Sequence, residues 1–279
     1  MWTTEVRPAV NAGHYGFYPS DPSELRQLLD RFFGAAVVPR EIDPIALVSP
    51  HAGYIYSGLT AAHAYKLLEE RARERAIVLA PSHYAAFPGA SVFPGRAFAT
   101  PFGNVPLDRQ FVAELLENYH IFDFYPDAER REHSLEVQLP FLQYVLRNFE
   151  LVPVVIYDRS LSNCKRVATA LLNVMEKLPK STIIVASSDL YHGPGAERAY
   201  RESEHTARAI AALEPIEFSS GVESGEYMAC GAGPITTAML MARTLGATRG
   251  TVLSLTTSYE AHPLSEDYVV GYAAVAYQR

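Results

Sequence analysis

The stretch TIIVASSDLYHG (residues 182–193) decides how the chain is expected to fold. Its first half is rich in β-branched residues and lacks the alternation of apolar and polar positions that marks a strand wetted on one face. Such a run predicts a strand that other elements cover on both sides. Its second half is polar and carries Asp189 and His192 where the strand would end. The stretch therefore predicts a buried α/β strand with reactive side chains at its carboxyl end.

Five further segments have the same character as this strand. They are IALVS (45–49), AIVLA (76–80), LVPVVIY (151–157), TVLSLTT (251–257) and YVVGYAAVAY (268–277). Helical patterns separate them, over residues 20–33, 57–75, 108–119, 134–149, 162–178, 196–213 and 233–246. Asp21 is the expected N-cap of the first helix, with Pro22 in its first turn. This alternation predicts an α/β fold with a mostly parallel or mixed central sheet and helices on both faces. The last two strands can pair as an antiparallel edge.

Length and composition are those of a globular protein. The 279 residues are 48% hydrophobic and 20% charged, and the formal net charge is −7. No linker, repeat or low-complexity tract divides them, so a single domain spanning residues 1–279 is expected. The Pro/Gly-rich stretch 84–106 is expected to form a short hairpin and a loop that can line a site.

The same statistics exclude several classes of partner. No Lys/Arg cluster follows the pattern of nucleic-acid binding, and no apolar run approaches the ~20 residues of a membrane helix. No signal peptide is visible, and Cys164 and Cys230 do not make a disulfide framework. We therefore expect a cytoplasmic location, without nucleic-acid or membrane partners.

Three expected strands end in polar turns that carry histidine. These turns are VSPHAGY with His51, APSHY with His83, and SSDLYHG with Asp189 and His192. Ligands of open α/β sheets collect outside the carboxyl ends of the strands, so these four side chains can meet in one cleft. Each also has an ordinary structural interpretation, as a hydrogen-bonded turn histidine or, for Asp189, as a helix cap.

The remaining histidines give weaker signals. His133 and Glu136 in EHSLEVQLP are three apart on one helix face, which fits either a pair that supports the site from behind or a simple helix start. His14 lies in a Gly/Tyr-rich turn and can reach a cleft. Surface or packing roles are expected for His63, His120, His205 and His262.

Cys230 stands in MACGAGPITTAML (228–240), just before a Gly-Ala-Gly-Pro turn that opens a helix. A helix N-terminus favours thiolate over thiol and would lower the pKa of this cysteine. With the neutral imidazoles of His51 and His83 it forms a three-ligand set that suits Fe(II), Zn(II) or copper and fits magnesium or calcium poorly. The alternative is a small buried residue that fills helix–sheet packing. Cys164 has no such setting.

These motifs, together with RPAVNAGHYGFYP (7–19), resemble those of the Memo family, whose microbial members are also called AmmeMemoRadiSam system protein B. They occur in the family's order and extend to VVGYAAVAY (269–277). The resemblance implies a fold similar to that of class III extradiol dioxygenases, non-haem Fe(II) enzymes that open catechol rings. It also implies an association with radical SAM and AMMECR-type proteins in one pathway.

The resemblance carries roles to individual residues. His51 and His83 match the two histidine ligands of the dioxygenases, and His192 matches their acid/base histidine. Cys230 stands where those enzymes have a glutamate, and a softer, oxidisable thiolate means that ring cleavage itself does not follow from the fold. Asp189 belongs to the same pocket. The expected substrate contacts are Tyr54, Tyr191 and His133.

Three functions follow as hypotheses. The first is an iron-dependent redox enzyme or oxygenase for a small molecule or peptide, in which His192, oriented by Asp189, transfers protons. The second is a non-catalytic module for peptides, including phosphorylated ones, as the resemblance to animal members implies. The third is a zinc hydrolase. A metal-free Cys230–His192 nucleophile pair ranks last, because it leaves His51 and His83 without a function.

Overall fold

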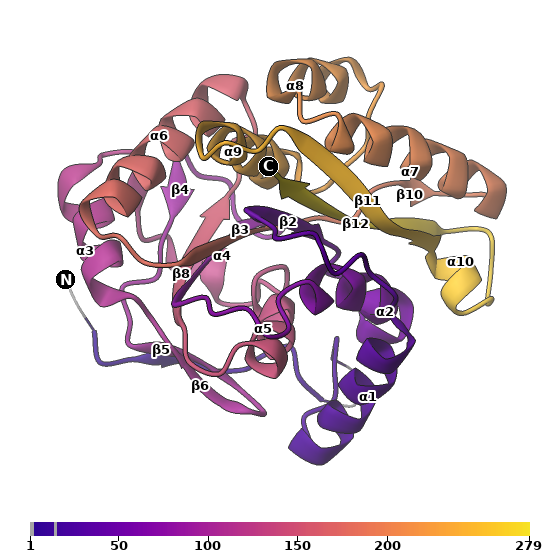
Figure 1. Ribbon diagram of the computed structural model, residues 1–279, viewed down its shortest axis with the longest axis horizontal. Helices are drawn as coiled ribbons and strands as arrows, with labels where there is room; N and C mark the ends of the chain where they lie inside the picture. The colour runs from indigo at the N-terminus through magenta and orange to yellow at the C-terminus, as the bar shows by residue number, and fades with distance from the viewer. Residues whose placement is uncertain (1–2, 14–15) are drawn as a thin grey trace.

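The computed structural model describes residues 3–13 and 16–279 and shows an α/β protein with a mixed central sheet of nine strands (Figure 1). Eight strands follow one another across the sheet, in the order β10 (His192–Gly193), β12 (Val269–Gln278), β2 (Ala46–Ser49), β9 (Thr182–Ser187), β3 (Arg75–Pro81), β8 (Glu150–Ile156), β4 (Ala90–Ser91) and β7 (Phe122–Asp123). The ninth, β11 (Arg249–Thr257), pairs with β12. The adjacent strands β2, β9, β3 and β8 are parallel, whereas β12 runs antiparallel to β2 and to β11. The expected pairing of the last two long strands is thus confirmed.

A small second sheet lies outside the central one. It consists of β1 (Val6–Arg7), β5 (Ala97–Thr100) and β6 (Gly103–Pro106). Strands β5 and β6 form an antiparallel hairpin, and β1 adds to β5 in parallel. The hairpin expected within residues 84–106 is therefore present, and it ties the N-terminal segment to this part of the chain.

Helices pack on both faces of the central sheet. Their bounds are α1 (Pro22–Ala35), α2 (Tyr54–Lys66), α3 (Arg109–Asn118), α4 (Pro126–Glu129), η1 (Glu136–Gln138), α5 (Leu139–Val145), α6 (Leu161–Lys177), α7 (Ala196–Ala211), α8 (Pro215–Ser224), α9 (Ala232–Thr244) and α10 (Ser258–Ala261). One face carries α3, α6, α7, α8 and α9, and the other carries α1, α2 and α5 (Figure 1). Within the described residues, none of these helices is long and apolar enough to cross a membrane.

Strand β3 shows why its sequence is a continuous apolar run. Ile77 and Leu79 belong to the hydrophobic cluster under α6 and α9. Their neighbours Ala76, Val78 and Ala80 point the other way, into the cluster under α1, α2 and α5. Successive strand residues face opposite sides of a sheet, so a strand covered on both faces needs apolar residues at every position.

Several elements differ from the expectation. Helix α2 ends at Lys66 instead of Arg75. Glu70, just beyond it, has a φ of 62°, and a right-handed helix cannot continue through such a residue. The helix expected over 134–149 is shorter, and it begins as the 3₁₀ turn η1 before α5. Asp21 caps α1 as expected, accepting hydrogen bonds from the backbone N–H groups of Ser23 and Glu24.

Candidate metal centre

The carboxyl ends of three adjacent parallel strands bring the sequence motifs together. Strands β2, β9 and β3 lie side by side in the sheet. His51 follows the end of β2 by two residues, His83 follows β3 by two, and Asp189 follows β9 by two. The prediction that these strand ends meet at one edge is confirmed.

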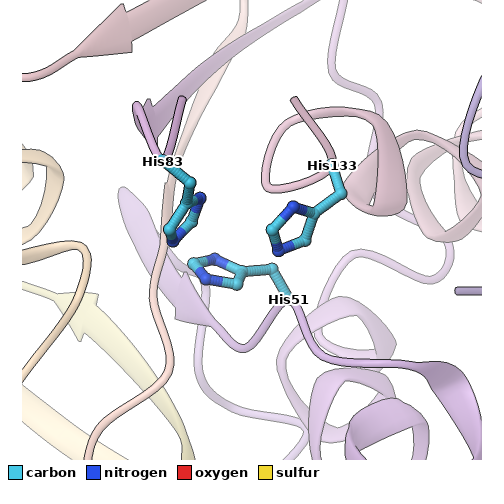
Figure 2. Close-up of side chains that lie close together, drawn as sticks. All are labelled: His51, His83 and His133. Carbon is cyan, nitrogen blue, oxygen red and sulfur yellow. The ribbon is translucent and has the colours of Figure 1, made fainter. Parts of the chain in front are cut away.

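Three histidines form a cluster at this edge, shown in Figure 2. The ligand nitrogens of His51, His83 and His133 all lie within 4.8 Å of one another. The ring of His51 stands nearly perpendicular to the other two, and the rings of His83 and His133 are stacked with centroids 4.8 Å apart. His51 is buried and His83 is exposed, so the cluster is open on one side. His133, expected as a substrate contact, is thus a member of the group that could hold a metal.

The tautomer of His51 is fixed by Ser187. The Ser187 hydroxyl donates to the carbonyl of Ser134 (2.6 Å) and accepts from Gln138 Nε2 (2.8 Å). Its remaining contact, at 2.8 Å, is His51 Nδ1. Because the one hydroxyl proton is already used, Nδ1 must be the donor. His51 therefore carries its proton on Nδ1 and turns the lone pair of Nε2 to the site.

His83 is held in the same way by Glu132. The Glu132 carboxylate accepts from His83 Nδ1 (2.9 Å) and from the backbone N–H groups of His83, His133 and Ser134. Burial would raise the pKa of Glu132, but these donors, the His83 ring first among them, lower it overall, so the carboxylate is ionised and can only accept. In the neutral ring, this bond puts the proton on Nδ1 and the lone pair on Nε2. Carboxylate–histidine pairs of this kind typically support metal ligands.

His133 comes from the turn between α4 and η1. Ser134 Oγ donates to the carbonyl of Pro81, at the end of β3, which docks this turn on the sheet. The ring of Phe17 stacks on His133 with centroids 4.2 Å apart. His133 Nδ1 is buried and makes no hydrogen bond among the described residues, although Glu132 Oε1 lies 3.4 Å away. A buried nitrogen left unpaired costs free energy unless a ligand satisfies it.

Electrostatics keep the imidazoles of His51 and His133 neutral. Burial lowers the pKa of each, and the neighbouring histidines lower it further. Neutral imidazole is the form that binds a metal.

Cys230 contacts the cluster through His51. It precedes the N-cap Gly231 of α9, as expected, and its Sγ lies 3.1 Å from His51 Nε2. Two ligand atoms bound to one metal at about 2.0–2.3 Å lie roughly 3–3.5 Å apart, so this spacing is compatible with a common ion. The expected lowered pKa is wrong for the metal-free thiol: burial, followed by the charge of Asp189, raises it. The role of Cys230 as a ligand stays a prediction.

Asp189 and His192 lie nearby but are not joined as expected. Asp189 Oδ1 accepts the backbone N–H of His51 (2.8 Å), and its Oδ2 is 4.0 Å from His51 Nε2. His192 Nδ1 donates to the carbonyl of Leu190 at 3.0 Å, so in the neutral ring Nε2 is the acceptor. The backbone carbonyl of Leu190 thus orients the ring of His192, whereas Asp189 was expected to orient it.

The two predicted tyrosine contacts lie in the core. Tyr54 is 2% exposed and donates its hydroxyl to the carbonyl of Val137. Tyr191 is 3% exposed and donates to the carbonyl of Pro194. Their hydroxyls are therefore occupied, and the exposed aromatic ring next to the cluster is Tyr84, which flanks His83 and His133. His14 lies outside the described residues.

Sequence reasoning missed Glu132, Ser187 and Phe17. Glu132 directly precedes His133, so a carboxylate next to a histidine was the signal that the sequence offered. Ser187 ends strand β9, where its role depends on partners from distant segments. Nothing in the local sequence marks Phe17.

The residues present fit a bound metal by their donor chemistry. Imidazole nitrogens converge, the Nδ1 atoms of His51 and His83 are held by Ser187 and Glu132, and the thiol of Cys230 lies beside His51. Imidazole and thiolate suit Fe(II), Zn(II) and copper better than magnesium or calcium.

The fold and this cluster define an α/β protein with a group of three histidines at the sheet edge that could hold a metal ion. The chain belongs to the Memo family, since the model of the Memo-like protein family matches residues 7–276. A MEMO1 family protein of Methanopyrus kandleri is 36% identical over 287 residues, covering 99% of each chain. One of Methanobrevibacter smithii is 35% identical, covering 96% of this chain and 98% of its own. One of Saccharolobus islandicus is 34% identical, covering 97% and 98%.

Proposed function

We propose that this chain is a non-haem iron-dependent redox enzyme, an oxygenase with a dioxygenase-like fold, that acts on a small molecule. The observation that carries the proposal is the cluster of His51, His83 and His133, whose ligand nitrogens lie within 4.8 Å of one another. Supporting bonds orient two of these rings before any ion binds. Such preorganisation is typical of metal centres and costly to maintain for packing alone.

The side chains of the centre have distinct tasks in this proposal. His51, His83 and His133 would hold the metal, with Cys230 as a fourth donor beside His51. Bound Fe(II) would supply open coordination positions and one-electron chemistry toward O₂ and substrate. His192 accepts a proton at Nε2, because its Nδ1 proton is committed to Leu190. Asp189 holds the backbone of His51 and places a carboxylate beside the site.

The test is metal content and oxygen use by protein purified without air. We expect about one iron per chain, and loss of the metal in His51→Ala, His83→Ala and His133→Ala. His63→Ala is the matched control, because His63 lies on the exposed side of α2 and bonds only its own helix among the described residues. The rate of oxygen uptake should fall in proportion to the iron content of each variant. Wild-type protein without metal, or cluster variants that keep it, would contradict the proposal.

A zinc-dependent hydrolase is the second candidate. Three histidines with an open position form a donor set typical of catalytic zinc. In that case the purified chain would carry zinc, air would not affect its activity, and His192 would act as a general base. Elemental analysis of the same preparations separates the two.

A further inference from the structure

A cavity opens beside Cys230 at the carboxyl edge of the sheet, next to the histidine cluster. It lies between the ends of β3 and β8 and the start of α9, and its volume is about 400 Å³. Small-molecule sites measure about 300–1,000 Å³, so this space fits a small organic ligand and not a folded partner. Its wall includes Tyr157, Asp158, Arg159, Cys230 and Gly233.

We propose that this cavity binds the anionic group of a small organic acid, and that Arg159 is the residue that selects it. The inference rests on the proposed function in one respect: the ligand in this cavity would extend past Cys230 toward the histidine cluster. The anion selectivity itself is a property of the metal-free chain and can be tested without any metal.

Arg159 is the cation of the cavity wall and is available for a ligand. It is exposed in the loop between β8 and α6, and no ion pair or side-chain hydrogen bond of its guanidinium is found within the described residues. Other arginines at buried positions are committed: Arg7 pairs with Glu136, and Arg75 pairs with Asp108. An uncommitted guanidinium on a cavity wall can bind a carboxylate through two parallel hydrogen bonds.

The rest of the wall agrees with an organic anion. Asp158, the acidic neighbour, accepts the backbone N–H of Ser160, which partly satisfies its charge. The ring of Tyr157 is 52% exposed and offers a flat surface to a ligand. Helix α9 has no side-chain cap, and its first residues line the cavity, so its positive end adds to the attraction.

Gly233 keeps the cavity close to α9. A Cβ at this position would lie 3.3 Å from Arg159 Cα and 3.3 Å from Ile156 Cγ2. The glycine thus allows the helix start to approach the arginine loop closely. Arg159 and the start of the helix therefore line the same cavity.

Cys230 is a built-in reporter for the charge preference of the cavity. Iodoacetate and iodoacetamide alkylate the same thiolate and have similar size, but only the first is an anion. The ratio of their rate constants at Cys230 cancels the thiolate fraction and reports the local attraction of anions. The chain would be treated with a chelator, and Cys230 read by mass spectrometry of its peptide. Cys164 is 0% exposed and serves as an internal unreactive site.

We expect Arg159→Gln to lower the iodoacetate-to-iodoacetamide ratio roughly three- to tenfold, and Arg159→Lys to retain most of it. Asp158→Asn should raise the ratio, since it removes the opposing charge. Arg166→Gln is the matched control, because it removes an exposed arginine from α6 outside the cavity lining. Benzoate should protect Cys230 in the wild type and not in Arg159→Gln.

Equal ratios in wild type and Arg159→Gln, or an equal decrease in Arg166→Gln, would overturn the proposal. Both outcomes are independent of iron or zinc content, so they do not touch the proposed metal chemistry. Conversely, if the chain binds no metal but the ratio changes in Arg159→Gln, the anion site is supported and the proposed metal chemistry is contradicted.

Discussion

Ser187 decides which nitrogen of His51 faces the site. Its hydroxyl gives its proton to Ser134 and accepts from Gln138 and His51, so its hydrogen-bonding capacity is complete. A single hydroxyl thus determines whether the His51 lone pair is available to a metal. This gives the first prediction.

We expect Ser187→Ala to weaken metal binding about 10–100-fold, because nothing then holds the His51 proton on Nδ1. The free energy of unfolding should also fall by about 1–3 kcal/mol, since the Gln138 amide and the Ser134 carbonyl lose a hydrogen-bond partner. Ser49→Ala is the matched control: Ser49 is equally buried and pairs with Ser187 across β2 and β9. Metal titration against a chromophoric chelator and urea unfolding measure the two effects. An unchanged affinity would show that the tautomer is not controlled here.

The thiol of Cys230 gives a second prediction at the residue scale. Cobalt(II) bound at the centre should show a sulfur-to-cobalt charge-transfer absorption, because a thiol near a metal ion loses its proton. Cys230→Ser should remove this absorption and leave weaker binding by the histidines. Cys164→Ser should leave the spectrum unchanged, since Cys164 lies buried against the carbonyl of Gly233. If the cobalt spectrum lacks this absorption, Cys230 is not a ligand and the metal is bound by the histidines without sulfur.

Sequence reasoning identified part of this site for a physical reason. His51, His83 and Asp189 each follow a strand by two residues, and adjacent parallel strands deliver such residues to one edge. His133 has no strand before it. It reaches the cluster because Ser134 bonds to the ends of β3 and β9, contacts that join segments about 50 residues apart along the chain. Nothing in a single sequence displays such a pairing.

At the scale of elements, the N-terminal segment is fastened over the cluster by one carboxylate. Glu136 in η1 is 0% exposed. It accepts from Arg7 (2.6 Å), Tyr18 (2.6 Å) and the backbone and side chain of Asn11 (2.9 Å each). The same segment carries Phe17, whose ring covers His133. The segment therefore acts as part of the wall of the site.

We expect Glu136→Gln to lower the free energy of unfolding by about 3–5 kcal/mol, because it removes the nearest counter-charge of the buried Arg7. Amide hydrogen exchange should rise in residues 7–11 and 16–18 more than in the central strands. Glu117→Gln, an exposed substitution on α3, is the control and should change neither. If exchange rises equally throughout the chain, Glu136 stabilises the fold in general and not this segment.

The elements themselves were predictable to different degrees. The six long strands were expected because a strand covered on both faces must be apolar throughout. Strands β4, β7 and β10 have two residues each, too few for any periodic pattern. Helix α8 was also missed, although Gly225 ends it in a left-handed conformation, which is a common helix stop.

At the scale of the whole molecule, the carboxyl and amino ends of the parallel strands carry different kinds of side chain. The carboxyl ends of β2 and β3 carry His51 and His83 of the cluster, and the end of β9 between them carries Asp189. The opposite end of β3 begins with Arg75, which pairs with Asp108 at 2.8 Å, and Lys180 bonds the same carboxylate. A buried ion pair thus lies at one edge of the sheet, while the histidine rings converge at the other edge, where a ligand can bind them.

Glu129 makes the stability of the molecule depend on pH. It is 4% exposed, its Oε1 has no hydrogen-bond partner among the described residues, and Arg7 Nε lies 4.0 Å from Oε2. Burial raises its pKa to about 7, against the opposing charge of Arg7. Because the folded pKa exceeds the unfolded one, the stabilising contribution is complete below about pH 4.5 and is lost as the pH rises through about 7.

We therefore expect Glu129→Gln, which is neutral at every pH, to be more stable than the wild type by about 2–3 kcal/mol near pH 8, and by little near pH 5. Urea unfolding at a series of pH values measures the difference between the two curves. Glu223→Gln, at an exposed position of α8, should follow the wild type throughout. A difference between Glu129→Gln and the wild type that stays constant from about pH 5 to 8 would mean that Glu129 is already ionised in the fold, with Arg7 outweighing its burial.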